Sequence, residues 1–560
     1  MVVEASPSPD SMSTQANTLT APAPGASHFS ARLGPWLVVL PIALITAIPV
    51  LVVLSALADP DQEIWNHLWQ YVLPELLVNT FWLVLGVGIG VTVLGVSLAW
   101  LTAACHYPGR KFFSWALLLP LALPAYVTAF VWLGLLDFSG PLATWLRDEF
   151  GIMKPPPIRS RGGVILVMTL ALYPYVYLTA RAAFQGQGRR LMEAAQSLGQ
   201  SRFQAFWRVA LPMARPGIMA GLLLAIMETL ADFGTVSVFN YNTFTTAIYK
   251  AWFSLFSLPA ASQLASILIF FVFVVALLEY QLRANRSYAA STRSSATPTR
   301  IVLTGWHAAL ATGWSALVFG LAFALPVWQI VKWAMNVYEQ DFDARYLDFA
   351  WHSLLLSGLG ALIVGALALT LGYAQRLHPT GAMRVTARLS TLGYALPGAV
   401  LAVGIFIPVA WLDNQLIDTL GLEGQVLGGT LVVMLLAYCA RFLAVSFGPV
   451  ESGLARISRS VDEAAQSLGV VGAKRLWRIH LPMLRVSVLT AAALTFVDIM
   501  KELPITLMTR PFGWDTLAVR VFEMTSEGEW ERAALPAAAI AIVGLLPVIF
   551  LIKNTEHAHS

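Results

Sequence analysis

The feature that most constrains this chain is a series of twelve apolar segments, separated for the most part by short polar loops. Each segment approaches the roughly 20 residues that a helix needs to cross a bilayer. Charged residues make up only 12% of the sequence, whereas a typical soluble domain carries about 25%. These features predict an all-α integral membrane protein with about twelve transmembrane helices, near residues 36–58, 77–103, 113–136, 163–184, 214–238, 262–282, 308–334, 354–375, 389–412, 428–447, 486–509 and 534–552.

A polar stretch precedes the first apolar segment. Residues 1–35 are rich in Ser, Pro, Ala and Thr and lack apolar periodicity, so we predict a disordered tail rather than a signal peptide. A second stretch, 283–300, is rich in Ser, Thr and Arg and predicts a linker. It separates a first six-helix unit, 36–282, from a second, 301–553, which leaves a short tail at 554–560.

The short loops differ in charge, and this difference predicts their orientation. Loops 59–76 and 413–427 carry acidic residues and no Lys or Arg, whereas loops 283–300 and 376–388 carry arginines and no acidic residue. Basic loops of membrane proteins face the cytoplasm. We therefore expect both termini, both tails and the linker on the cytoplasmic side of a bacterial inner membrane.

A long motif occurs twice in the sequence. EAAQSLGQSRFQAFWRVALPMAR begins at Glu193, and EAAQSLGVVGAKRLWRIHLPMLR begins 270 residues later, at Glu463. Thirteen of these 23 positions are identical. A shorter pair, LALPA at 121–125 and YALPG at 394–398, repeats at nearly the same offset. Because each unit holds six spans, we expect two parallel repeats related by an axis along the membrane normal.

Each copy of the long motif lies between the fourth and fifth spans of its unit. It predicts two short helices that meet at a glycine, Gly199 or Gly469, in a left-handed backbone conformation. The second helix has apolar residues at i, i+3 and i+4, and Pro212 or Pro482 should end it. This amphipathic face would lie either on lipid or on a protein partner; it consists of Phe203, Phe206 and Trp207 in one copy and Ala473, Leu476 and Trp477 in the other.

The glutamate that opens each copy has two interpretations. Ser460 and Glu463 match the S-x-x-E capping box, in which the glutamate only caps its own helix. Arg190 stands at the equivalent position before Glu193, so the same explanation fails in the first copy. A carboxylate kept in both copies indicates a partner outside its own helix.

These residues carry a resemblance to a known family. Glu-Ala-Ala, a glycine six residues after the glutamate, and Leu-Pro twelve to thirteen residues further on resemble the EAA loop of bacterial ABC importer permeases, the inner membrane components of binding-protein-dependent transport. The resemblance implies the type I ABC importer fold, fused in one chain. It also implies that each loop docks in a groove of a cytoplasmic ATPase, through Glu193, Ala194 and Gly199 in one copy and Glu463, Ala464 and Gly469 in the other.

The resemblance also defines the expected partners. No GxxxxGK[ST] motif occurs in the sequence, so we expect no enzyme activity and no cofactor in this chain. ATP and Mg would be bound by two copies of a separate ABC ATPase. A substrate-binding protein, periplasmic or lipid-anchored, would deliver the substrate, and the remaining partner would be membrane lipid, with no nucleic acid.

Four acidic residues lie well inside predicted spans; a fifth, Glu279, lies near the end of its span, four residues before Arg283, and is interpreted as structural. A charge at the bilayer centre costs roughly 2.5–3.5 kcal/mol, so such residues are functional candidates by default. The first four occur as pairs four residues apart, which places both carboxylates of a pair on one helix face. The pairs are Glu228 with Asp232 and Asp498 with Glu502. At the offset of 270, Glu228 corresponds to Asp498 and Asp232 corresponds to Glu502.

Two interpretations of these acids remain open. They would line the path of a cation, without forming a fixed metal site, or they would tie helices together. In the second case Lys501 would neutralise Glu502, and Arg441 in the tenth span would need a counter-ion of its own. Oxygen ligands suit hard cations. Tyr173, Tyr175 and Tyr177 would suit ferric iron too, although aromatic residues at membrane edges are commonly anchors.

A further resemblance concerns the cargo. ETLADFGTVSVF and KELPITLMTRPFGWDTLAV are similar to segments of the fused permeases of ferric iron importers, over both units. This resemblance implies transport of ferric iron by alternating access. If the four acids line the path, they would make transient contacts with the ion. Related fused permeases carry thiamine or aminoethylphosphonate. A secondary transporter driven by an ion gradient is the alternative from another class, and the position and spacing of the repeated loop disfavour it.

Overall fold

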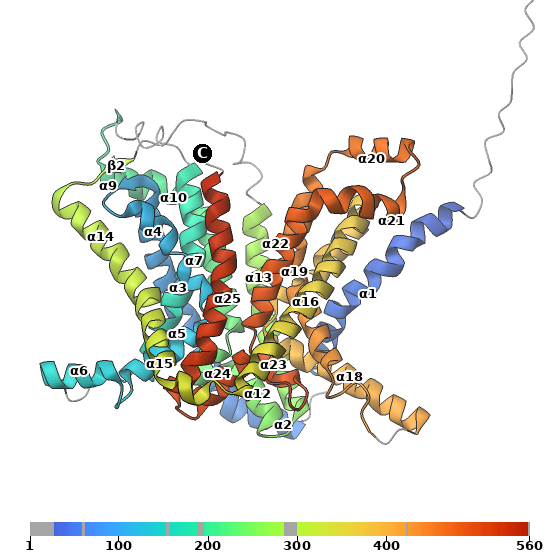
Figure 1. Ribbon diagram of the computed structural model, residues 1–560, viewed down its shortest axis with the longest axis horizontal. Helices are drawn as coiled ribbons and strands as arrows, with labels where there is room; N and C mark the ends of the chain where they lie inside the picture. Colours follow the sequence, from blue (N-terminus) through green and yellow to red (C-terminus); the bar gives the residue numbers. More distant parts are fainter. Residues whose placement is uncertain are drawn as a thin grey trace, which may run out of the picture.

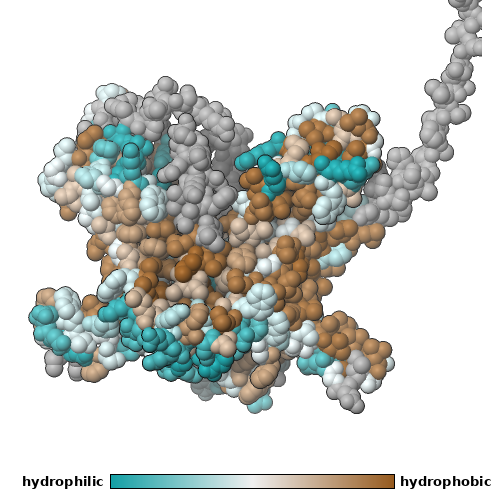
Figure 2. Space-filling model, in the orientation of Figure 1, coloured by the Kyte–Doolittle hydropathy of each residue, from teal (hydrophilic) through white to brown (hydrophobic). Residues whose placement is uncertain are grey.

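The computed structural model describes residues 27–58, 62–152, 157–186, 195, 197–284, 300–421 and 424–557. Within them the chain is almost entirely helical, and the long helices lie side by side (Figure 1). Figure 2 shows a broad apolar band across the middle of the molecule, with hydrophilic residues gathered above and below it. Eleven of the described helices are long and apolar enough to cross a membrane, which agrees with the predicted all-α membrane fold.

The long helices follow the predicted segments closely. The first unit contains α1 (Ser27–Ser55), α3 (Leu73–Ala104), α5 (Ala125–Leu136), α7 (Arg161–Gly186), α10 (Leu211–Ala231) and α13 (Leu258–Ala284). The second contains α14 (Gly305–Phe319) running into α15 (Leu325–Asp341), then α16 (Ala344–Leu377), α18 (Gly398–Leu420), α19 (Leu431–Arg456), α22 (Leu481–Met500) and α25 (Trp530–His557). The first helix thus begins at Ser27, inside the stretch expected to be disordered.

Short elements connect these helices. On one face lie α4 (Arg110–Ala116), α9 (Arg202–Ala205), α20 (Arg459–Ser467) and α21 (Gly472–Arg475); we call this the loop face (Figure 1). The opposite face carries α2 (Gln62–His67), α6 (Pro141–Phe150), α12 (Phe244–Phe253) and α24 (Leu517–Ser526). The remaining short helices are α11 (Gly234–Val238), α17 (Gly381–Ser390) and α23 (Pro504–Thr509).

Two of the predicted spans are broken in the middle, and the sequence motif ALP marks both breaks. Segment 113–136 divides into α4, a 3₁₀ turn and α5, and segment 389–412 divides into α17, a 3₁₀ turn and α18. Pro124 and Pro397 precede α5 and α18 in an extended backbone conformation. Proline removes a backbone donor and disfavours the helical conformation of the residue before it, so a continuous helix cannot pass through either site.

The two units interlock, because the first helices of each pack on the other. Helix α1 lies against the second unit, at the right of Figure 1, where Thr46 Oγ1 donates to the carbonyl of Ser390 at 3.0 Å. Helix α14 lies against the first unit, where Tyr107 and Ser315 share a hydrogen bond of 3.0 Å. A short parallel pair of strands, β1 (Cys105–His106) and β2 (Ile301–Val302), joins the units beside α14.

Glycines allow α7 to pack closely between α3 and α10. A Cβ on Gly90 would lie 2.5 Å from Thr169 Oγ1, and a Cβ on Gly221 would lie 2.7 Å from the carbonyl oxygen of Tyr175. Gly86 with Gly90, and Gly217 with Gly221, form the G-x-x-x-G spacing that lets membrane helices approach backbone to backbone. Packing at these glycines holds the first unit together.

Replacing Gly221 with leucine should therefore destabilise the permease. The new side chain would meet backbone atoms of α7 that cannot move aside, and overpacking of this kind costs about 1–3 kcal/mol. The midpoint of thermal unfolding in detergent would fall. Gly358→Leu is the matched control, because no atom lies within 4 Å of a Cβ at that helical position; equal midpoints for the two variants would contradict the packing role of Gly221.

Candidate coupling loops and translocation cavity

The second copy of the repeated motif forms an exposed helix on the loop face. Helix α20 covers Arg459–Ser467, and the side chains of Glu463 and Ala464 point to solvent. Gly469 ends the turn after it with φ of 73°, the left-handed conformation that was predicted. In the described part of the chain the carboxylate of Glu463 has no hydrogen-bond or ion-pair partner. It is available to a separate protein.

The predicted capping box of α20 is wrong. The N-cap residue is Ser458, and its side chain makes no capping hydrogen bond. Ser460 lies inside the first turn, and its hydroxyl instead lies 2.7 Å from that of Ser458. A capping box needs the serine at the N-cap, so Glu463, five residues after Ser458, is too far along the helix to take part.

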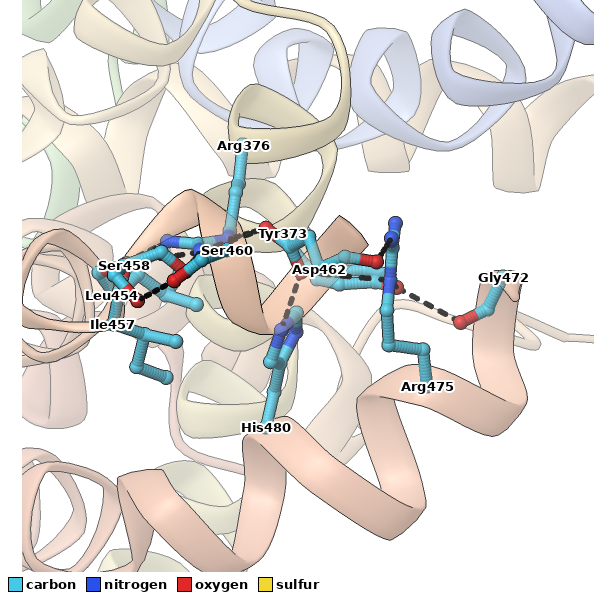
Figure 3. Close-up of polar contacts among 10 residues, drawn as sticks. All are labelled: Tyr373, Arg376, Leu454, Ile457, Ser458, Ser460, Asp462, Gly472, Arg475 and His480. Atoms are coloured by element: carbon cyan, nitrogen blue, oxygen red, sulfur yellow. Dashed lines mark hydrogen bonds and ion pairs between the residues drawn. The ribbon is translucent and has the colours of Figure 1, made fainter. Parts of the chain in front are cut away.

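One carboxylate anchors α20 to the rest of the second unit. Asp462 Oδ2 lies 2.7 Å from Arg376 Nη2, and its Oδ1 lies 2.8 Å from His480 Nε2 and 3.6 Å from Arg475 Nε (Figure 3). His480 is fully buried. The four side chains come from α16, α20, α21 and the turn before α22, so Asp462 joins the exposed helix to two transmembrane helices.

Arg376 extends this network to α19. Its guanidinium donates to the carbonyls of Leu454 at 2.5 Å, Ile457 at 3.0 Å and Ser458 at 3.2 Å (Figure 3). These carbonyls belong to the end of α19 and the connection to α20. Helix C-termini leave carbonyls without helical partners, and Arg376 satisfies them. The base of the second loop is therefore held by charge-assisted hydrogen bonds.

The first copy is held differently. Glu193 and Ala194 lie outside the described residues, while Gly199 has the predicted left-handed conformation with φ of 84°. Phe206 packs against Trp100, with ring centroids 4.7 Å apart. At the offset of 270, Met192, Ala205 and Ala210 stand where the second copy has Asp462, Arg475 and His480. The network of Figure 3 has no counterpart in the sequence of the first loop.

The prediction that proline ends the second short helix is wrong. In both copies the helix continues into the next span through a five-residue π turn, Phe206–Ala210 or Leu476–His480, and the proline is the second residue of the span. Proline has no backbone donor for the preceding turn, and a π turn directly before it is a local departure from regular α-helical bonding of the kind that occurs inside helices. The loop helix and the transmembrane helix therefore form one continuous element that can transmit movement.

The amphipathic face of this helix is divided between protein and solvent. Phe206 turns inward onto Trp100, whereas Phe203 and Trp207 are 72% and 53% exposed. In the second copy Leu476 is half-buried, and Trp477 is 67% exposed. The exposed aromatic residues of both loops remain available to lipid or to a partner.

The four predicted intramembrane acids lie together in a single cavity. It opens at the interface of the two units, and Glu228, Asp232, Asp498 and Glu502 all line it. Residues from α5, α7 and α10 form one side, and residues from α19, α22 and the start of α23 form the other. The two acidic pairs that the offset of 270 relates in the sequence therefore also line the same cavity.

The acids of the second unit have basic partners in this cavity. Lys501 Nζ lies 2.8 Å from Asp498, and Arg441 Nε lies 3.6 Å from Glu502. The expected pairing of Lys501 with Glu502 is therefore wrong. Helix α22 ends at Met500, and Lys501 turns back over the last helical turn to the residue three positions before it. Arg441 does find its counter-ion, and it also donates to the carbonyl of Leu396 at 2.6 Å.

The expectation that each acidic pair shares one continuous helix face is also wrong. Helix α10 ends at Ala231, and Asp232 accepts hydrogen bonds from Thr235 Oγ1 at 3.0 Å and the amide of Val236 at 3.1 Å. Glu502 likewise accepts from the amide of Ile505 at 3.0 Å. Each carboxylate caps the short helix that follows, so both spans are discontinuous at the cavity. Broken helices of this kind surround the substrate sites of many transporters.

The three clustered tyrosines have different roles. Tyr173 and Tyr177 are fully buried and donate to the carbonyls of Leu117 at 2.9 Å and Ser114 at 3.0 Å, which ties α7 to α4. Tyr175 lines the cavity. Among the described residues no three His, Cys, Asp or Glu side chains are grouped closely enough to hold a metal ion.

Sequence reasoning missed several residues of these sites. Tyr126 and Tyr394 line the cavity, and Asp462 with its basic partners anchors the second loop. A comparison of the two copies held a signal for the second group, because Arg475 and His480 replace alanines of the first copy. Nothing in the repeat marks Tyr126.

Two repeated helical units with a polar cavity at their interface and an exposed loop on one face define a membrane transport permease. The family of binding-protein-dependent transport system inner membrane components matches the chain twice, over residues 92–286 and 366–556, and the chain belongs to this family.

Two of the named relatives cover most of the chain, and a third covers 37% of it. The Fe(3+)-transport system permease protein FbpB 2 of Haemophilus influenzae is 29% identical over 86% of this chain and 90% of its own length. The ferric transport system permease protein FbpB of Actinobacillus pleuropneumoniae is 24% identical over 88% of this chain and 72% of its own. The molybdenum transport system permease protein ModB of Escherichia coli is 30% identical over 37% of this chain and 85% of its own.

Proposed function

We propose that this chain is the transmembrane permease subunit of an ATP-driven importer of ferric iron. The observation that carries the proposal is the cavity, where four carboxylates from both units line one space. Carboxylate oxygens are ligands that hard cations prefer. The relatives named for ferric transport match both units, which supports the same cargo.

The loop face supports an ATPase partner. Glu463 and Ala464 are exposed on α20, and this helix is joined through Asp462 to α16 and α22. An ATPase that docks here would move α22, whose other end carries Asp498 and the start of the cavity wall. Two loops, one in each unit, provide for two ATPase copies, which bind the ATP and Mg and perform the hydrolysis.

The orientation follows from these partners. With ATPases in the cytoplasm, the loop face, both termini and the linker would be cytoplasmic, in the inner membrane of a bacterium. A substrate-binding protein, free in the periplasm or anchored by lipid, would dock on the opposite face. The cavity would then open alternately to the two sides as the ATPases close and separate.

Reconstitution tests this proposal. The permease is placed in proteoliposomes with its candidate ATPase and ferric-loaded binding protein, and uptake of radioactive ferric iron is measured with and without internal ATP. Uptake that needs ATP and both partners is the expected result. ATP hydrolysis without iron uptake would remove ferric iron as the cargo, and uptake by the permease alone along an ion gradient would overturn the ABC mechanism.

A further inference from the structure

The cavity is built from equivalent positions of the two units but is unequal in charge. At the offset of 270, both acids of one unit correspond to acids of the other, and all four line the cavity. The basic residues do not correspond: Ala171 and Ala231 of the first unit stand where the second has Arg441 and Lys501, and these four residues also line the cavity. Two built-in cations therefore lie on one side only.

This inequality leaves the acids of the first unit without a basic partner. Within the described residues, neither Glu228 nor Asp232 forms an ion pair. Asp232 is held by neutral donors of α11, and the hydrogen bond recorded for Glu228 is a long one of 3.4 Å from the hydroxyl of Tyr394. A carboxylate in an apolar environment is costly unless a cation neutralises it. Arg441 and Lys501 act on Glu228 from the other side of the cavity, but neither forms an ion pair with it in the described structure.

A separate observation marks the same side as a binding site. Tyr126 lines the cavity and is only 6% exposed, yet its hydroxyl has no hydrogen-bond partner in the described structure. Buried hydroxyls are normally satisfied. Gly234, two residues after Asp232, makes room for this ring, because a Cβ there would lie 2.6 Å from Tyr126 Cβ. The Tyr126 ring is thereby held near the start of α11, and its hydroxyl has no hydrogen-bond partner among the described residues.

We propose that the cavity binds a multivalent cation on the side of the first unit, through the carboxylates of Glu228 and Asp232 and the hydroxyl of Tyr126, while Arg441 and Lys501 fill the equivalent place in the second unit. The inference rests on the proposed function and adds the position of the cargo to it. The donors are all oxygen atoms, which selects hard cations. Two carboxylates and one hydroxyl are a small set of ligands, which suits transport because the ion must also leave.

Terbium(III), a trivalent cation that also prefers oxygen ligands, serves as the probe. Binding to the full-length permease in nanodiscs of neutral lipid is followed by terbium luminescence excited through nearby aromatic rings. Two double variants are compared, Glu228→Gln with Lys501→Met and Asp498→Asn with Lys501→Met. Both remove the same lysine and leave the net charge of the cavity unchanged. The first keeps Asp498 without its ion-pair partner, whereas the second removes Asp498 together with that partner.

We expect the variant that lacks Glu228 to bind terbium about tenfold more weakly and the variant that lacks Asp498 to bind like wild type. Equal binding by the two variants would overturn the proposal, as would weaker binding by the Asp498 variant alone. A variant that does not fold is recognised by its gel-filtration profile. In that case Asp232→Asn, which keeps an acceptor for the donors of α11, replaces Glu228→Gln. The variant compared with it is then Glu502→Gln with Arg441→Met. Failure of ferric uptake with this binding pattern intact would reject the cargo but keep the site.

Discussion

Glu463→Arg is expected to abolish productive contact between the second loop and the ATPase while the permease still folds. The glutamate is exposed and unpartnered in the described structure, so the change should cost little stability. If its carboxylate meets a basic residue of the ATPase, the reversal replaces an attraction by a like-charge contact that costs several kcal/mol. ATPase co-purification and permease-stimulated ATP hydrolysis should both fall at least about tenfold.

Glu527→Arg is the matched control for this change. Glu527 is also an exposed glutamate, but it follows α24 on the opposite face (Figure 1). The substitution Glu527→Arg should leave ATPase co-purification at the wild-type level. Glu193→Arg tests the first loop in the same way, and the double variant should lose ATP-driven uptake altogether. Normal uptake by the double variant would remove the docking role from both loops.

Asp462→Ala is expected to reduce coupling to the ATPase about as strongly as Glu463→Arg, but for a different reason. Arg376, Arg475 and His480 share this carboxylate in a largely buried site. Breaking a buried ion pair by removing one partner costs about 3–5 kcal/mol, because the remaining charges stay buried without compensation. The anchor of α20 should be lost, and with it most ATP-driven uptake and a large part of the thermal stability.

A triple variant separates the anchoring role from a general loss of folding. Asp462→Met, Arg475→Ala and His480→Ala together give the second loop the residues of the first, Met192, Ala205 and Ala210. Arg376 keeps its carbonyl acceptors, so removing Asp462 together with the other two basic residues should restore thermal stability toward wild type. If Asp462→Ala alone melts and transports like wild type, the cluster of Figure 3 does not anchor the loop.

The repeat in the sequence predicted long-range features of the site well. Glu228 and Asp498 are far apart in the chain, yet the offset alone paired them, and the structure places both in one cavity. The reason is that parallel repeats bring equivalent positions to a shared axis. The left-handed glycines of both loops were predictable for a local reason, because glycine adopts positive φ without strain.

Local side-chain pairing was harder to predict than the fold. Lys501 is next to Glu502 in sequence but pairs with Asp498, because the helix ends just before it. The breaks at Asp232 and Glu502 depend on hydrogen bonds from the following short helices. Hydropathy predicts one span through each of these points; charged residues interrupt the second at Asp498, Lys501 and Glu502, but their presence does not locate the end of the helix.

The interlocked packing of α1 has a consequence for the order in which the protein is made. Helix α1 emerges from the ribosome first, but α17 and α18, on which it packs, begin at Gly381 and Gly398. At about 5–20 residues per second, synthesis of the intervening chain takes tens of seconds. During that time α1 has lipid around it and, once α13 is made, one helix of the first unit, where Ser266 Oγ donates to the carbonyl of Val53 at 2.6 Å. Helix α1 is the most apolar of the candidate spans, and it carries no charged residue from Leu33 to Ser55. The helix that waits for its partners in the second unit is thus the one best suited to remain in lipid.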